Sequence, residues 1–216
     1  MPAKPRSVYV CSECGYETAK WVGKCPNCNM WNTMTEEVSV SVKSPSISST
    51  KLNKATAMPL SQIDFAGETR YVTGISELDR VLGGGIVKGS VVLLSGDPGI
   101  GKSTILLQVC NALQENFKIL YVSGEESALQ IKMRAGRMGI ESDNVSIMTE
   151  TDVTAVCEYI KSVKPHLVMI DSIQTMQIPE LSSSPASIVQ VRESTNMLLH
   201  TGKSLGIPVF IVGHVN

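Results

Sequence analysis

The feature that most constrains the fold is a glycine-rich turn between an apolar run and a helical pattern. The run VVLLS (91–95) predicts a buried strand, and KSTILLQVCNALQEN (102–116) has the apolar spacing of a helix. Between them, GDPGIGKST (96–104) matches the pattern G-x-x-x-x-G-K-[ST] of a phosphate-binding loop. An ordinary glycine-rich turn would explain neither the lysine nor the hydroxyl at these offsets. The sequence therefore predicts a site for the phosphates of a nucleotide.

Each part of this loop has an expected chemical role. Glycines let successive backbone N–H groups point at phosphate oxygens, and the helix N-terminus adds its positive end. Lys102 supplies a charge to the β- and γ-phosphates, and the Ser103 hydroxyl is a ligand for Mg²⁺. The expected nucleotide-binding residues are Gly96, Asp97, Pro98, Gly99, Ile100, Gly101, Lys102, Ser103 and Thr104.

Strand and helix patterns alternate through the rest of the chain. Four further apolar runs predict strands at 118–124, 145–150, 166–172 and 207–214, with helical patterns between them. Continuous apolar strands that alternate with helices indicate a parallel sheet covered on both faces. The sequence thus predicts an α/β fold with a mostly parallel sheet and a phosphate loop.

Two acidic positions are expected beside the phosphate loop, because parallel strands bring their carboxyl ends to one edge of the sheet. Asp171 ends the strand LVMID, and we expect it to hold Mg²⁺ through water; a strand-ending aspartate without this role is the alternative. Glu125 and Glu126 follow the strand before it, in YVSGEES. We assign the polarisation of the attacking water to Glu125. Glu126 is the alternative, or it caps the next helix. The expected catalytic residues are Lys102, Glu125 and Asp171.

A separate signal comes from the six cysteines, four of which form two C-x₂-C pairs, CSEC (11–14) and CPNC (25–28). Two tight turns that bring four sulfurs together make a tetrahedral site that suits structural Zn²⁺. A redox dithiol pair or disulfides are the alternatives. Cys110 and Cys157 lie in helical patterns, and we expect them to be packed thiols. The expected zinc ligands are Cys11, Cys14, Cys25 and Cys28.

Composition divides the chain into three regions. Residues 1–35 form the expected zinc module, which is too small to fold without its metal. Residues 36–60 are rich in Ser, Thr and Lys and predict a flexible linker, although VSVSV (38–42) also suits a short strand. Residues 61–216 form the expected core. No apolar run reaches the ~18 residues of a membrane span, and the N-terminus has no secretory h-region, so we expect a cytoplasmic location.

These motifs together resemble the bacterial RadA/Sms family of DNA-repair proteins. The resemblance is carried by KWVGKCPNCNMWNT with the CSEC pair, by TGISELDRVLGGGIVKGSVVLLSGDPGIGKST, and by LYVSGEES, LVMIDSIQT and VGHV. It implies a RecA-like ATPase core that uses ATP, Mg²⁺ and Zn²⁺ and binds single-stranded or branched DNA. It also implies a strand-exchange recombinase as partner and a homo-hexamer in the full-length family. His214 would lie near the γ-phosphate and couple nucleotide state to DNA; a structural hydrogen bond is the alternative.

Three segments are candidates for contact with single-stranded DNA, which needs cations for its phosphates and aromatic rings for its bases. The zinc module is the first, although packing of its tryptophans inside the module is the favoured alternative. The second is KMRAGRMG (132–139), for which a solvated helix face is an equal explanation. The third is the long polar stretch 172–190, by analogy with loops that face DNA in RecA-like folds. The residues concerned in the first two are Lys20, Trp21, Lys24, Trp31, Lys132 and Arg134.

The sequence also departs from the family pattern. Family members continue with further core strands, a lysine-asparagine-arginine-phenylalanine-glycine motif and a domain resembling the Lon protease, none of which occurs in these 216 residues. We therefore expect a C-terminally incomplete core and keep three hypotheses. The first is a DNA-dependent ATPase of recombinational repair. The second is a KaiC-like nucleotide-dependent switch without a DNA role. The third is a non-catalytic remnant in which only the zinc module works.

Overall fold

The chain divides into two units, Met1–Glu68 and Thr69–Asn216, which are described separately below. The computed structural model describes residues 6–39, 59–62, 70–181 and 183–214. Most of the expected linker, at 40–58, and the start of the expected core, at 63–69, lie outside the described residues.

The first unit is a small antiparallel sheet with the strand order β2–β1–β3. Its strands are β1 (Arg6–Cys11), β2 (Glu17–Thr18) and β3 (Met34–Ser39), followed by a 3₁₀ turn, η1 (Leu60–Gln62). β3 pairs with β1 along its whole length, with Glu36 opposite Tyr9. The prediction that the linker begins at residue 36 is therefore wrong, because residues 36–39 are fixed by this backbone pairing.

The second unit is built on a five-stranded sheet with the order β6–β10–β9–β7–β8, in which every neighbouring pair is parallel. The strands are β6 (Val91–Gly96), β7 (Ile119–Ser123), β8 (Val145–Thr149), β9 (Leu167–Asp171) and β10 (Val209–His214). These are the five strands that the apolar runs predict, and the α/β architecture is confirmed. β6 and β8 are the edges of this sheet among the described residues.

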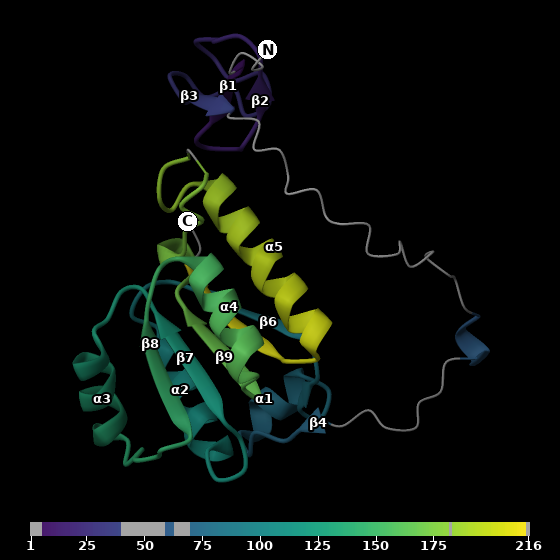
Figure 1. Cartoon of the computed structure of the whole chain (residues 1–216), viewed down its shortest axis with the longest axis vertical. Helices are drawn as coiled ribbons and strands as arrows, with labels where there is room; N and C mark the ends of the chain where they lie inside the picture. The colour runs from purple at the N-terminus through teal and green to yellow at the C-terminus, as the bar shows by residue number, and fades with distance from the viewer. Residues whose placement is uncertain (1–5, 40–58, 63–69, 182, 215–216) are drawn as a thin grey trace. The chain divides into compact units, whose positions relative to one another are not determined.

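Helices cover both faces of the sheet, as Figure 1 shows for α4 and α5 on the face nearest the viewer. The helices are α1 (Ser76–Val81), α2 (Lys102–Leu113), α3 (Ala128–Arg137), α4 (Val153–Val163) and α5 (Ile188–Leu205). Alternate strand residues point to opposite faces. Val122 and Val168 pack with α4 and α5, whereas Tyr121 and Met169 pack with α1, α2 and α3. The sheet therefore lies between two apolar cores, one on each face.

Local signals fix where the helices begin and end. Asp152 accepts hydrogen bonds from the backbone N–H groups of Thr154 and Ala155, so it is the N-cap of α4. α5 begins after Ser187, which accepts a hydrogen bond from the Gln190 N–H, and ends at Gly206 in the left-handed conformation. These caps fix the start of α4 and both ends of α5.

The short elements before β6 were not predicted. They are β4 (Arg70–Tyr71), α1 and β5 (Ile86–Val87), where β4 and β5 form an antiparallel pair. The Asp79 carboxylate organises them, because it accepts hydrogen bonds from Thr73 N–H and Oγ1 and from Gly74 N–H. Gly85 allows the close approach of the two strands, since a Cβ there would lie 2.7 Å from the Tyr71 carbonyl oxygen. The TGISELDRVLGGG motif therefore has a structural role in this chain.

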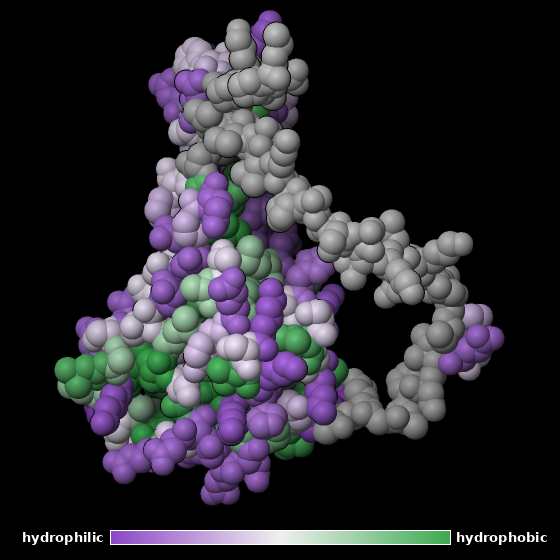
Figure 2. Space-filling view, viewed as in Figure 1, coloured by the Kyte–Doolittle hydropathy of each residue, from purple (hydrophilic) through white to green (hydrophobic). Residues whose placement is uncertain are grey.

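Hydrophobic residues also reach the surface of the second unit, at the edge formed by α3 and β8 (Figure 2). Ile131 on α3 is fully buried, while Leu129 and Met133 on the same helix are exposed. Among the described residues, no helix combines the length and the apolar character needed to cross a membrane.

Candidate nucleotide and zinc sites

The predicted phosphate loop leaves β6 and enters α2 at the carboxyl edge of the sheet. Gly99 and Gly101 have φ angles of +80° and +103°, a conformation that residues with a Cβ rarely adopt. Gly101 is also the N-cap of α2 and offers no side chain to the first turn, which contains no acidic residue. The N–H groups of that turn are therefore open to an anionic ligand. Ser103 and Thr104 lie in this turn, as the sequence predicts.

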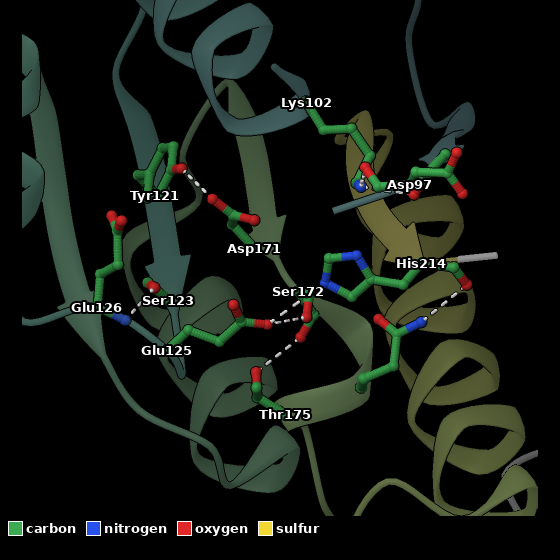
Figure 3. A network of polar contacts seen from close by, with 12 residues as sticks. Asp97, Lys102, Tyr121, Ser123, Glu125, Glu126, Asp171, Ser172, Thr175 and His214 are labelled. Atoms are coloured by element: carbon green, nitrogen blue, oxygen red, sulfur yellow. Dashed lines mark hydrogen bonds and ion pairs between the residues drawn. The ribbon is translucent and has the colours of Figure 1, made fainter. Parts of the chain in front are cut away.

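Lys102 turns back over the loop that precedes it (Figure 3). The residue is only 6% exposed, and its Nζ donates to the carbonyl oxygens of Gly96 at 2.6 Å and Asp97 at 2.8 Å. An ammonium group has three protons, so one remains for another acceptor. The loop thus holds a buried cation against two of its own carbonyl oxygens and leaves one ammonium proton to donate to a phosphate oxygen.

Asp171 ends β9 at the same edge and is buried. The Tyr121 hydroxyl donates to its Oδ2 at 2.5 Å, and Arg134 Nη2 lies 3.9 Å from the same oxygen. Among the described residues, Oδ1 makes no polar contact. Burial and the charge of Asp171 raise the pKa of Tyr121 far above its usual value, so the phenol remains a donor. The arrangement holds Oδ2 in place and leaves Oδ1 to accept from another ligand, as an aspartate beside a hydrated Mg²⁺ requires.

Arg134 and Tyr121 are functional candidates that the sequence reasoning missed. The sequence places Arg134 with Lys132 on a DNA-binding or solvated helix face, and the solvated face is wrong for this residue. Its Nη2 lies 2.7 Å from Glu126 Oε2, and its side chain is largely buried. Two signals were present in the sequence: Arg134 is three residues after the buried Ile131, and a tyrosine in an aliphatic strand needs a partner for its hydroxyl.

The structure separates the two glutamates after β7. Glu125 Oε1 accepts a hydrogen bond from the Ser172 hydroxyl at 2.5 Å and keeps a half-exposed side chain. Glu126 instead pairs with Arg134. Glu126 does not cap α3, because Ser127 and Gln130 form a capping box there. Among the described residues, the Glu125 carboxylate has no lysine or arginine partner, and it is the one that is open to water.

His214 lies between Glu125 and the strand of the phosphate loop. It is the last residue of β10 and pairs with Gly96 of β6, while its Nε2 is 3.7 Å from Glu125 Oε1. The alternative role for His214 is a structural hydrogen bond made by its side chain. Its ring makes no hydrogen bond among the described residues. Its backbone carbonyl does accept one, from Gln174 Nε2 at 3.3 Å.

The stretch after β9 differs from the long polar loop that the sequence indicated. It opens with a 3₁₀ turn, η2 (Ile173–Thr175), and Met176 and Ile178 are buried against α4 and α5. The Gln190 side chain then holds the loop in place. Its Oε1 accepts a hydrogen bond from the Ile178 N–H, and its Nε2 donates to the carbonyl oxygens of Ile178 and Ser183. The first half of this stretch is therefore part of the core.

The four cysteines of the first unit lie together, as predicted. Their sulfurs are all within 4.8 Å of one another, with Cys11 and Cys28 at 3.6 Å and Cys14 and Cys25 at 3.5 Å. Four ligands at the usual Zn–S distance of about 2.3 Å would be about 3.8 Å apart in a tetrahedron. The distances are far too long for disulfides, and all four thiols are free. The geometry fits a structural zinc ion.

Equivalent turns build the two halves of this site. The residue after each C-x₂-C pair, Gly15 or Asn29, has a positive φ and donates its N–H to the carbonyl of the first cysteine, Cys11 or Cys25. Burial raises the pKa of Cys11, but hydrogen bonds with Thr33 and with nearby backbone outweigh it and lower this pKa to about 6. Cys11 is therefore ready to bind a metal as a thiolate.

The tryptophans of the zinc module are not packed inside it, so the favoured prediction is wrong. Trp21 is 58% exposed and Trp31 is 69% exposed. The small core consists of cysteines with Met34, Tyr9 and Val22 around them. The four cysteines belong to this small core, and neither tryptophan does.

The two remaining cysteines match their expected role. Cys110 on α2 and Cys157 on α4 are buried in the two apolar cores. Burial raises the pKa of Cys110 to about 12 and raises that of Cys157 as well. Both are packed thiols.

Comparisons with known proteins agree with these two parts of the chain. Residues 9–36 match the family model of a rubredoxin metal-binding domain of the zinc-ribbon type, and residues 71–150 match that of the KaiC ATPase domain. A solved KaiC-like protein from Pyrococcus horikoshii superposes with a TM-score of 0.57 over 69% of this chain and 72% of its own, at 22% identity. The RecA-like fold of the core and the zinc ribbon are therefore confirmed.

Longer relatives align with almost all of the chain. The DNA repair protein RadA of Listeria monocytogenes is 50% identical over 214 residues, which is 99% of this chain and 47% of that protein. RadA of Bacillus subtilis is 45% identical over 217 residues, and RadA of Haemophilus influenzae is 43% identical over 219. The chain spans about half the length of these curated relatives. The resemblance to the RadA family of DNA-repair proteins is therefore confirmed over nearly the whole of this chain.

Proposed function

We propose that this chain binds ATP with Mg²⁺ at residues 96–104 and hydrolyses it, as the ATPase part of a DNA-dependent enzyme of recombinational repair. The observation that carries the proposal is the convergence of Lys102, Asp171 and Glu125 at one edge of the parallel sheet. The buried ammonium of Lys102, the braced carboxylate of Asp171 and the open carboxylate of Glu125 supply different chemistry at this edge.

In this proposal the loop amides and Lys102 hold the β- and γ-phosphates. Ser103 and Asp171 would hold Mg²⁺, which neutralises charge on the phosphates when it is bound. Glu125 accepts a proton from the attacking water, whose oxygen bonds to the γ-phosphorus as the bond to the β-phosphate oxygen breaks. The Ser172 hydroxyl orients the Glu125 carboxylate through its hydrogen bond.

His214 is the proposed link from this chemistry to DNA. Its backbone pairs with Gly96 at the start of the loop, and its ring contacts Glu125. Loss of the γ-phosphate would change the positions of Gly96 and Glu125, the two residues beside His214. Action on branched DNA beside a strand-exchange recombinase, assembly into a hexamer and a cytoplasmic location belong to the same proposal, and the RadA relatives support it through their description as DNA repair proteins.

The test is ATP hydrolysis by the purified chain, with and without single-stranded DNA, beside Lys102→Ala. We expect DNA-stimulated hydrolysis that is lost in the variant, with ATP–Mg²⁺ raising the unfolding midpoint of the parent protein. Equal hydrolysis by both proteins would overturn the site. Hydrolysis that DNA never changes would favour the KaiC-like switch, and an unfolding midpoint that ATP–Mg²⁺ does not shift would favour the remnant.

A further inference from the structure

The two tryptophans of the chain form one exposed surface on the zinc ribbon. A Cβ placed on Gly23 would lie 3.5 Å from Trp21 Cη2 and 3.8 Å from Trp31 Cζ3, so both indoles reach the same point above a residue without a side chain. Both rings are more than half exposed. Exposed tryptophans side by side are unusual on a protein surface, and such groups mark binding sites.

Backbone bonds hold this surface in place. The Asn32 N–H donates to the Gly23 carbonyl at 2.9 Å, and Lys24 and Trp31 form an isolated antiparallel bridge. The segments that carry the two indoles are therefore tied together beside the metal site. The backbone that carries the indoles therefore loses little conformational entropy when they bind a ligand.

The charges around the indoles favour an anionic ligand. Residues 18–35 contain Lys20 and Lys24 and no acidic residue. Both lysines are exposed, and Lys24 Nζ lies 5.8 Å from the centre of the Trp31 ring. A flat aromatic surface with flanking cations is the combination that binds unpaired bases and their phosphates. A partner protein could use the indoles, but it would not need the two lysines beside them.

We propose that Trp21 and Trp31 form a stacking platform for unpaired bases of a single-stranded nucleic acid, with Lys20 and Lys24 contacting its phosphates. The inference rests on the proposed function, because it names the part of the chain that meets the DNA. The DNA or RNA identity of the strand is left to the test, since bases and phosphates are common to both.

The chain provides its own probe, because Trp21 and Trp31 are its only tryptophans. Indole fluorescence excited at the red edge of its band reports the ribbon alone. Zinc-loaded protein is titrated with oligothymidylate, with oligouridylate and with a duplex of the same length. We expect saturable quenching by the single strands that weakens with added salt, and little quenching by the duplex.

Variants separate stacking from general attraction. Trp21→Ala and Trp31→Ala should each raise the Kd for oligothymidylate roughly 5- to 150-fold, measured with a labelled strand. Lys24→Gln should weaken binding less and flatten its salt dependence. Tyr159→Ala is the matched control, because Tyr159 is an exposed aromatic residue on α4 and should leave the Kd unchanged. Zinc content shows that each ribbon is folded.

The outcomes distinguish this inference from the proposed function. Quenching that persists in Lys102→Ala while hydrolysis is lost supports both. DNA-stimulated hydrolysis in Trp21→Ala and Trp31→Ala with unchanged Kd overturns the platform and leaves the ATPase standing. Quenching without hydrolysis by the parent protein overturns the ATPase and leaves the platform standing. No quenching of the zinc-loaded protein at low salt overturns the platform.

Discussion

Tyr121 and Asp171, which are fifty positions apart in the sequence, are joined by a hydrogen bond of 2.5 Å from the phenol to the carboxylate. Tyr121 is the middle residue of β7 and Asp171 is the last residue of the neighbouring β9; both are buried, and the phenol is the closest donor to Oδ2. In the proposed site the carboxylate beside Mg²⁺ is therefore held by a residue of the neighbouring strand.

Tyr121→Phe removes this donor while keeping the ring that fills the core. We expect the protein to lose about 1.5–3 kcal/mol of stability, the usual contribution of a hydrogen bond to a charged group. We also expect hydrolysis to need several-fold more Mg²⁺, because the carboxylate is no longer held in one orientation. Thermal unfolding and a magnesium titration of the hydrolysis rate measure the two effects. A stability loss with an unchanged magnesium titration would limit Tyr121 to a structural role.

Glu125→Gln should abolish most hydrolysis while ATP still binds. A general base contributes about 10²- to 10⁴-fold, and the amide cannot accept the proton of the attacking water. Glu126→Gln is the control, because it changes the neighbouring residue that pairs with Arg134. Single-turnover hydrolysis and nucleotide binding should be measured for both. If Glu126→Gln has the larger effect on hydrolysis, our assignment of the two residues is reversed.

Gly124→Ala tests how tightly the edge of the sheet is packed. A Cβ at this position would overlap Thr175 Oγ1 and would lie 3.0 Å from Thr151 Cγ2, so the loop after β7 must move. We expect a stability loss of about 1–3 kcal/mol, as for other overpacked sites. Gly136→Ala is the matched control, because nothing lies within 4 Å of its Cβ in α3, and it should stabilise the helix by about 0.5–1 kcal/mol. Chemical unfolding of both variants checks the opposite signs.

Zinc removal should change the reactivity of four thiols and leave two unchanged. The metal-bound sulfurs become reactive when a chelator takes the zinc, whereas Cys110, whose pKa is raised to about 12 by burial, has almost no thiolate at pH 8. We expect one zinc per chain, and four thiols that react with a disulfide reagent after chelation. Cys110→Ala and Cys157→Ala should keep the zinc, and Cys25→Ser should lose it. Six fast-reacting thiols in the chelated protein would contradict the packing of the cores.

The parts of the fold that the sequence predicts are those with local patterns. The five strands, the glycine loop and the paired cysteines each depend on spacing within a few residues, and each lies where it was expected. Arg134 and Trp31 could not be placed in this way. The first turns inward because Glu126 lies on the loop before its helix, and the second faces outward because the metal site occupies the interior. Both depend on which residue or group is the contact partner, and a repeating pattern does not give this.

The same limit explains the short elements before β6. Six-residue helices and two-residue strands have too few positions for a periodic pattern. The carboxylate of Asp79 and the glycine at position 85 determine that region, and each acts through a backbone group several residues away.

β6 carries the nucleotide loop and pairs with β10 alone among the described strands, with Leu93 64% exposed on it. A strand with one unpaired backbone edge readily accepts another strand. A strand added at this edge would form backbone hydrogen bonds with the residues of β6 that lead directly into Gly96. We therefore expect self-association of this chain and its affinity for ATP–Mg²⁺ to depend on each other. Sedimentation at several protein concentrations, with and without the nucleotide, would show this linkage, and sedimentation unaffected by nucleotide would rule it out.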